Sequence, residues 1–238
     1  MKVKPFRAPR LLLATLAQAR TILRGFWFLL CTRKFLWLAL LAVVMTLGLL
    51  LMPYDVALLT RLHFWNDDQD ATARGLSRFL SFWGNYPVYN VSLAVLIWLY
   101  GVGRKSSKWR RIALVCLLAA SFAGLFDDAI RMTVGRPRPD TNLPDHFHGF
   151  TNAFEGTYQS FPSGHAATTF GTAAALLVCD LPLGLLATAY AFAVIWARLE
   201  LYRHYPSDII VGAAIGIFFG LMVALGARLH RPRPHRKI

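Results

Sequence analysis

Two histidines and one aspartate stand beside long apolar runs, and their spacing suits acid–base chemistry. His165 lies in FPSGHAAT (161–168), and His204 and Asp208 lie in RHYPSD (203–208). Four residues make about one helical turn, so His204 and Asp208 are expected on the same face of a helix. The carboxylate would accept the N–H of one imidazole nitrogen and leave the other nitrogen basic. His165, from a different helix, would supply the proton for a leaving group.

These residues lie in two of three polar stretches, 131–139, 161–165 and 198–208, and the first and third stretches contain five arginines. We find no matching cluster of carboxylates in the sequence, and the planar guanidinium suits phosphate oxygens, so the expected ligand is an anion. Pro162-Ser163-Gly164 opens an apolar run, where the free N–H groups of a helix N-terminus would face the same ligand. The candidate anion-binding residues are Ser163, Gly164 and the arginines Arg131, Arg136, Arg138, Arg198 and Arg203.

These residues allow three other interpretations. Asp208 follows Pro206-Ser207 and would serve as a helix N-cap, although Ser207 is the better cap candidate. The histidines, with Asp208 and the nearby His146 and His148, offer zinc ligands, but a cation among several arginines is electrostatically unfavourable. Ser163 lacks the glycines of the G-x-S-x-G nucleophile elbow, which argues against a serine hydrolase. We therefore expect a site without metal or cofactor.

The elements that position these residues are predicted to cross a membrane. The 238 residues are 56% hydrophobic and 16% charged, which is too apolar for a soluble domain. Six apolar blocks approach the ~17–25 residues that an α-helix needs to span a bilayer. Asp180 and Pro182 divide the run 163–199 into two of them. We predict an all-α integral membrane bundle of six transmembrane helices: Phe35–Met52, Val88–Gly103, Ile112–Ile130, Ser163–Cys179, Leu183–Leu199 and Asp208–Ala227.

The basic residues predict the orientation of this bundle. Of 26 Lys and Arg, eight lie in 1–34, five in 104–111 and five in 228–238. Six spans place all three segments on one side, which the positive-inside rule assigns to the cytoplasm together with both termini. Anionic lipid headgroups are the expected partners of these segments, rather than nucleic acid or an obligate protein partner. The three stretches with histidines and arginines then emerge at the other face.

The N-terminal segment 1–34 has two interpretations. Ala17-Gln18-Ala19 looks like a signal-peptidase site, but the apolar core before it is only about seven residues long and four basic residues would follow the cut. We expect an uncleaved amphipathic helix on the inner surface, with Phe26, Trp27 and Phe28 dipping into lipid. A solvated basic arm is the alternative.

The three stretches together resemble the signature of the type 2 phosphatidic acid phosphatase superfamily, K-x6-R-P, P-S-G-H and S-R-x5-H-x3-D. They read here as Arg131-(MTVGRP)-Arg138-Pro139, Pro162-Ser163-Gly164-His165 and Ala197-Arg198-(LELYR)-His204-(YPS)-Asp208. The resemblance includes the six-span layout and covers about residues 35–227. Arg131 replaces the usual lysine and keeps its charge. Ala197 replaces the usual serine and removes one possible hydrogen bond to phosphate.

The resemblance implies roles for individual residues. His204 would be the nucleophile that forms a phosphohistidine, Asp208 would orient it, and His165 would protonate the leaving group and then activate water. The phosphoryl oxygens would be held by Ser163, the Gly164 amide and the three arginines Arg131, Arg138 and Arg198. The family requires no metal.

The predicted topology, the position of the site at the lipid–water boundary and the resemblance together suggest an organisation and a substrate class. Residues 1–34 would form the amphipathic segment, 35–227 the phosphatase domain and 228–238 a cytoplasmic tail, with the active site facing the periplasm of a bacterial inner membrane. Undecaprenyl pyrophosphate, phosphatidylglycerol phosphate, phosphatidic acid and the phosphates of lipid A are candidate substrates. The loops 53–87 and 140–159 would guide or select the lipid, although the aromatic residues of 53–87 equally suit an interface belt.

Two other functions stay open. A lipid phosphotransferase would pass the same phosphohistidine to another lipid instead of water. A non-enzymatic lipid or anion carrier would place charged or broken helices at the bilayer midplane, and here the charges cluster at the rim. The vanadate-binding haloperoxidases of the superfamily are disfavoured because they are soluble.

Overall fold

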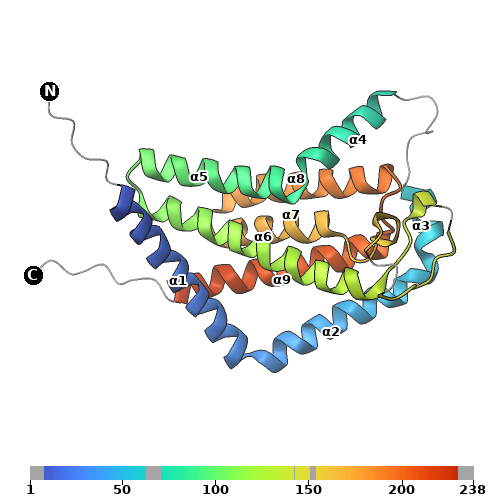
Figure 1. The fold of residues 1–238 in the computed structure, drawn as a ribbon, viewed down its shortest axis with the longest axis horizontal. Helices are drawn as coiled ribbons and strands as arrows, with labels where there is room; N and C mark the ends of the chain where they lie inside the picture. The colour runs from blue at the N-terminus through green and yellow to red at the C-terminus, as the bar shows by residue number, and fades with distance from the viewer. Residues whose placement is uncertain (1–7, 63–70, 142, 151–153, 230–238) are drawn as a thin grey trace, which may run out of the picture.

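The computed structural model describes residues 8–62, 71–141, 143–150 and 154–229, and these residues form helices and connecting turns without a β-strand (Figure 1). The predicted all-α class is therefore confirmed. The helices are α1 (Ala8–Thr32), α2 (Lys34–Leu51), α3 (Asp55–Leu62), α4 (Ala71–Trp83), α5 (Ser92–Gly103), α6 (Ser107–Val134), α7 (Gly164–Cys179), α8 (Leu181–Glu200) and α9 (Pro206–Leu229). Short helical turns are η1 (Met52–Tyr54), η2 (Pro87–Val91), η3 (Pro139–Thr141) and η4 (Gly156–Tyr158).

Four segments of the described chain are long and apolar enough to cross a membrane, namely Lys34–Leu62, Ser107–Val134, Leu181–Glu200 and Pro206–Leu229. A fifth is obtained if Ala71–Trp83 and Pro87–Gly103, which meet at a bend of 61°, count as one span. The apolar α7 has 16 residues and is shorter than these. Length and composition thus give four or five spans, and the predicted count of six depends on α7.

The predicted break between two spans is confirmed. Helix α7 ends at Cys179 and α8 begins at Leu181, so Asp180 alone separates them. Pro182 lies in the first turn of α8, where its missing N–H removes no helical hydrogen bond. The two helices consequently run in opposite directions beside each other, as Figure 1 shows.

Helix α7 lies at the centre of the bundle and packs against α6, α8 and α9 (Figure 1). Its contact with α9 depends on three glycines spaced four residues apart. A Cβ atom on Gly212, Gly216 or Gly220 would lie only 2.3–2.5 Å from a backbone carbonyl oxygen of α7 or of Ser163 before it. Small residues at this spacing let two helix backbones touch, as in membrane interfaces. The close approach brings the start of α7 against the start of α9.

Helix α1 crosses the end of the bundle opposite to the three polar stretches and packs on α9 and α6 (Figure 1). Gly25 and Gly226 face each other at the crossing. Phe26 is buried there and stacks on Phe122 with ring centroids 4.7 Å apart, so its predicted insertion into lipid is wrong. Trp27 and Phe28 are exposed. Most of the tail 228–238 lies outside the described residues.

The segment 53–87, predicted as a loop, contains helices α3 and α4. Helix α4 packs against α8, and Figure 1 shows it diverging from the bundle beyond the bend before α5. Phe79, Phe82 and Trp83 are exposed on it. Phe64 and Trp65 of the same segment lie outside the described residues. The segment is helical because its aromatic and aliphatic residues recur on one face of each helix.

Candidate active site

The three polar stretches meet at one end of the bundle. The first includes the C-terminal end of α6, the second includes the start of α7, and the third joins α8 to α9, so each is attached to a helix of the packed core. The backbone N–H of Ser163 donates to the carbonyl of Asp208 at 3.1 Å. A Cβ on Gly164 would lie 3.3 Å from an Nη atom of Arg131. Residues far apart in the sequence therefore line one site.

His204 is buried in this site, and its hydrogen bonds define its tautomer. Its Nδ1 lies 2.8 Å from the carbonyl oxygen of Ser160, and its Nε2 lies 3.2 Å from Nη2 of Arg198. A carbonyl accepts only and a guanidinium donates only, so Nδ1 carries the proton and Nε2 presents its lone pair. Burial and the charge of Arg198 lower the pKa of His204 well below its ordinary value. The imidazole is thus neutral at physiological pH with a basic Nε2.

Asp208 does not contact His204 in the way its spacing predicted. Its Oδ2 lies 3.9 Å from Nδ1 of His204, beyond hydrogen-bond distance. That oxygen instead accepts from the Ser160 hydroxyl at 2.6 Å and from the Tyr205 backbone N–H at 2.8 Å. The direct orientation of His204 by Asp208 is therefore wrong. The Ser160 carbonyl orients the ring, and Asp208 fixes Ser160 through its hydroxyl.

The hydrogen bond from the Tyr205 N–H also shows which of the two candidates, Asp208 or Ser207, caps the start of α9. The carboxylate of Asp208 reaches back to a free N–H before α9, as the acidic residue of a capping box does. Ser207, expected to be the better cap, uses its hydroxyl for Asp55 and Arg136 instead. Asp208 therefore caps α9 and also takes part in the buried polar network.

The buried network is centred on Arg136, for which the sequence suggested only anion binding. Its guanidinium is 1% exposed and pairs with Asp55 at 2.9 Å, Asp145 at 2.7 Å and Asp208 at 2.6 Å. The three carboxylates raise the pKa of Arg136 further above its ordinary value. All three guanidinium nitrogens of Arg136 therefore donate hydrogen bonds within the protein, and the side chain is not available to a ligand.

The sequence suggested that the five arginines of the polar stretches lack carboxylate partners, and this is true of only two of these arginines. Arg131 pairs with Asp128 and lies 3.7 Å from Asp127, and Arg203 pairs with Asp140 at 2.5 Å. Within the described residues, Arg138 and Arg198 have no salt bridge, and the Nε atom of each is buried without a hydrogen-bond partner. Burial and nearby Arg203 lower the pKa of Arg138 to about 10. These two guanidiniums have donors left for an anion.

Ser163 and Gly164 form the start of α7 and lie beside these arginines. Ser163 is the N-cap residue, and its hydroxyl is fully buried without a hydrogen-bond partner among the described residues. A buried hydroxyl without a partner costs free energy, so a native example calls for an explanation. A phosphate oxygen at the helix N-terminus would accept from this hydroxyl and from the free N–H groups of the first turn.

Replacing Ser163 with alanine is expected to lower kcat/KM about 10- to 100-fold, the effect of one hydrogen bond to a charged group. The melting temperature should stay unchanged or rise slightly, because the hydroxyl has no protein partner to lose. Ser160→Ala provides the contrast, since its hydroxyl donates to Asp208 and its loss should reduce both activity and stability. Equal destabilisation of the two variants would show that Ser163 has a structural role instead.

His165 lies in the first turn of α7 and faces two cavities of about 520 and 440 Å³. Arg131, Gly164 and Asp128 line the larger cavity, and Arg198 and Arg203 line the smaller. The Nε2 atom of His165 lies 3.1 Å from the Ser81 carbonyl at the end of α4, so Nε2 carries a proton and Nδ1 is the nitrogen left for proton exchange. The two histidines, Ser163 and the chosen arginines other than Arg136 thus lie at one site.

The sequence reasoning missed Asp55, Asp145 and Ser160. Asp55 offered a signal, since a carboxylate inside the apolar segment Lys34–Leu62 is costly and implies a partner. Ser160 acts partly through its backbone carbonyl, and a backbone contact leaves no trace in residue type. His146 and His148 stack on each other with ring centroids 4.2 Å apart. No group of three or more metal-ligating side chains is found among the described residues.

The chain is similar to proteins of known family. Residues 109–232 match the model of the PAP2 superfamily. A lipid A 1-phosphatase of Rhizobium johnstonii is 36% identical over 44% of this chain and 43% of the relative, so the match spans less than half the length of that protein. A decaprenylphosphoryl-5-phosphoribose phosphatase of Mycobacterium tuberculosis is 34% identical over 68% of this chain and 84% of the relative.

A solved structure shares the fold. The crystal structure of a transmembrane PAP2 type phosphatidylglycerolphosphate phosphatase from Bacillus subtilis matches with a TM-score of 0.59 and 20% identity. It covers 79% of this chain and 93% of that chain. At this identity the likeness concerns the fold alone.

Proposed function

Because this chain belongs to the PAP2 superfamily, we propose that it is a membrane lipid phosphatase that works through a phosphohistidine at His204. The observation that carries the proposal is the unprotonated Nε2 of His204 beside Arg198, whose Nε has no protein partner among the described residues. A nucleophile and a cation for the phosphoryl oxygens are thus placed together. The relatives named above are phosphatases of lipid phosphates, which supports the same class.

The proposed reaction has two displacements. His165 begins as the imidazolium, with a second proton on Nδ1. In the first displacement, Nε2 of His204 attacks phosphorus and the bond to the lipid oxygen breaks, while His165 gives its Nδ1 proton to that oxygen and becomes neutral. In the second, neutral His165 takes a proton from water, the water oxygen attacks phosphorus and the P–N bond breaks. Inorganic phosphate leaves and His204 is again neutral. A covalent intermediate divides one difficult displacement into two easier ones.

The anion-binding residues supply most of the expected rate. Phosphoryl transfer has a loose transition state with charge on the equatorial oxygens, so positioned cations and N–H groups stabilise it. In this proposal Arg198, Arg138 and the start of α7 at Ser163 and Gly164 contact those oxygens. Arg131 contributes charge but shares its guanidinium with Asp128 and Asp127.

The site is proposed to face the periplasm at the lipid–water boundary of a bacterial inner membrane. The support is the charge distribution, because the basic segments 1–34, 104–111 and 228–238 are predicted on the other side. This topology counts α7 as a sixth span of 16 residues in the middle of the bundle. A phosphate at the boundary would leave its hydrocarbon part in the bilayer.

The substrate is proposed to be a lipid A phosphate or a polyprenyl-linked phosphate, in line with the two relatives. The test is a phosphate-release assay on the purified protein with lipid A, undecaprenyl pyrophosphate, phosphatidylglycerol phosphate and phosphatidic acid. We expect release from lipid A or the polyprenyl substrate to be fastest, in the presence of a chelator as well. Loss of lipid phosphate without stoichiometric inorganic phosphate would indicate a phosphotransferase, and no turnover of any substrate would contradict the proposal.

The pH dependence of kcat/KM follows from the environment of His204. Burial and Arg198 lower its pKa, so the neutral nucleophile persists below about pH 6.5 and the acidic limb of the profile is expected below that value. The unfolded chain takes up this proton first as the pH falls, so the stability contributed by the neutral residue is lost below about pH 6.5. A pH–rate profile of the free enzyme measures the limb.

Arg198→Gln tests the cause of this shift. Removing the charge should raise the pKa of His204 and move the acidic limb of the profile to higher pH. This shift is expected in addition to a lower kcat/KM. Arg203→Gln is the control, because Arg203 pairs with Asp140 at the surface. An acidic limb that stays in place in Arg198→Gln would refute the electrostatic explanation.

A further inference from the structure

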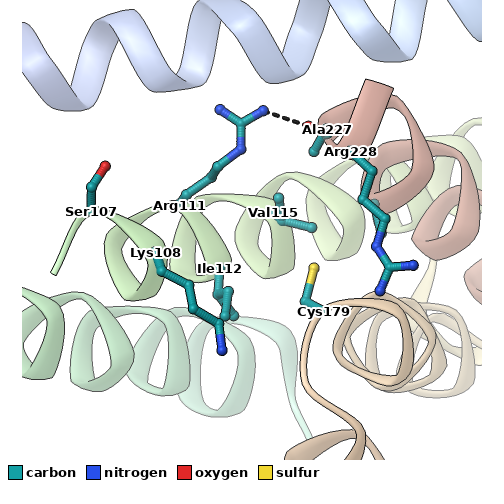
Figure 2. Close-up of a pocket in the computed structure, with 9 residues that line it drawn as sticks. Ser107, Lys108, Arg111, Ile112, Val115, Cys179, Ala227 and Arg228 are labelled. Atoms are coloured by element: carbon teal, nitrogen blue, oxygen red, sulfur yellow. Dashed lines mark hydrogen bonds between the residues drawn. The ribbon is translucent and has the colours of Figure 1, made fainter. Parts of the chain in front are cut away.

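A separate pocket lies at the other end of the helices that carry the candidate active site. It has a volume of about 340 Å³ and is enclosed by the start of α6 and the ends of α7 and α9 (Figure 2). Lys108, Arg111 and Arg228 line it with positive charge. Its apolar lining comes from Ile112, Val115, Cys179, Ala224 and Ala227.

Arg111 makes one wall of this pocket rigid. Its Nη1 donates to the Thr21 hydroxyl at 2.8 Å and its Nη2 donates to the Ala227 carbonyl at 2.6 Å, as the dashed line in Figure 2 shows for the latter. These bonds tie α6 to α1 and α9. Because the side chain is held by protein on both sides, its charge stays at the pocket.

Of the three cations that line the pocket, Lys108 and Arg228 have exposed side chains that can change conformation. The Lys108 side chain is 59% exposed and lies 3.7 Å from Asp180, a weak surface pair. Arg228 is exposed, and Figure 2 shows its guanidinium extending toward Cys179. Three cations thus surround the pocket, and the exposed pair with Asp180 leaves the Lys108 ammonium able to turn toward an anion.

We infer that this pocket binds the phosphate headgroup of an anionic phospholipid, in the leaflet opposite the candidate active site. The three cations suit a phosphate, and the apolar lining suits the carbon chain attached to it. Basic pockets between transmembrane helices are known to hold anionic headgroups. Free phosphate would use the cations alone, so the apolar lining favours a lipid.

The bound lipid would stabilise the active-site helices from their far ends. Helices α6, α7 and α9 enclose the pocket and also position Arg131, Ser163 and Asp208. A ligand that binds the folded protein but not the unfolded chain raises the stability of the protein by mass action. The inference does not depend on the proposed function, because it uses none of the site's chemistry.

The thiol of Cys179 can report on whether the pocket is occupied. Cys179 lines it and is partly exposed, whereas Cys116 is buried and Cys31 is exposed elsewhere on α1. In a Cys31→Ser background, the rate of maleimide labelling therefore reports access to Cys179. The rate is measured in detergent with added phosphatidylglycerol, phosphatidylcholine or inorganic phosphate.

Phosphatidylglycerol should slow labelling of Cys179 and raise the melting temperature, whereas phosphatidylcholine should do neither. In Lys108→Gln/Arg228→Gln, about tenfold more phosphatidylglycerol should be needed for the same protection. The matched control is Arg104→Gln/Lys105→Gln, which removes the same charge from exposed residues outside the pocket and should behave like the parent.

Three results would overturn the inference. They are no protection by phosphatidylglycerol, an equal loss of protection in the two double variants, and protection by inorganic phosphate as strong as that by the lipid. The second would indicate diffuse attraction to a basic surface, and the third a site for soluble phosphate. Cys179 lies at the opposite end of the helices from His204, so its labelling should not respond to a ligand at His204. Failure of the proposed phosphatase activity would therefore leave the labelling results unchanged.

Discussion

Replacing His204 with alanine is expected to lower kcat by at least about 10⁴-fold and to abolish the trapped phosphoenzyme, because the attacking nitrogen is lost. The measurement combines steady-state phosphate release with labelling by a ³²P-labelled substrate, quenched in alkaline detergent so that a phosphohistidine survives. A phosphohistidine is acid-labile and alkali-stable, which distinguishes it from a phosphoserine at Ser163. An active His204→Ala variant would mean that another group attacks phosphorus.

His165→Ala is the matched control for this experiment, since both residues are imidazoles in one site. With a lipid substrate we expect a loss of about 10²- to 10⁴-fold, the usual contribution of a general acid. An aryl phosphate has a leaving group that needs no proton, so the first displacement should be largely preserved. The His165→Ala variant should then accumulate phosphoenzyme from the aryl substrate, and His204→Ala should not.

Replacing Arg136 with leucine is expected to be the most destabilising change at this end of the protein. The substitution leaves Asp55, Asp145 and Asp208 converging without their shared cation. Breaking a buried ion pair costs about 3–5 kcal/mol, so the apparent melting temperature in detergent should fall by about 10 °C or more. Activity should fall as well, because Asp208 holds Ser160 and Ser160 orients His204.

Two controls separate this network from a general effect of arginine loss. Arg203→Gln breaks the surface pair with Asp140, in which the side chains are 44% and 32% exposed, and should cost less than about 1 kcal/mol. Arg136→Lys keeps the charge but loses the fork that reaches three carboxylates, so an intermediate result is expected. An Arg136→Leu variant that melts at the same temperature as the parent protein would refute the proposed role.

The candidate site residues are identifiable from the sequence because their types are rare beside apolar runs. Histidines, arginines and turn residues that cluster at the ends of hydrophobic blocks indicate a polar site, although one of them, Arg136, pairs within the protein. The ends of α7, α8 and α9 are predicted to within a few residues by the same contrast between polar and apolar segments. Family resemblance adds the roles of His204 and His165, which remain proposals.

The partners within the site could not be predicted in the same way. Spacing placed Asp208 one turn from His204, yet the carboxylate binds Ser160, Tyr205 and Arg136. Helical periodicity gives the face on which a residue lies, while the choice among nearby donors depends on distances of a few tenths of an ångström. The arginines illustrate the same limit, since Arg136 and Arg138 look alike in sequence but only Arg136 is neutralised among the described residues.

The sequence by itself determined the class of the fold and the polar stretches, and it predicted an anionic ligand, because these follow from residue chemistry and from the cost of placing charge in lipid. Tertiary structure decided which arginines are free, which carbonyl orients His204 and that a basic pocket forms at the far end of α6, α7 and α9. These features join residues from different helices. Contacts between helices arise from backbone approach, such as that of Gly216 to Ala167, and such approach has no local signature in the chain.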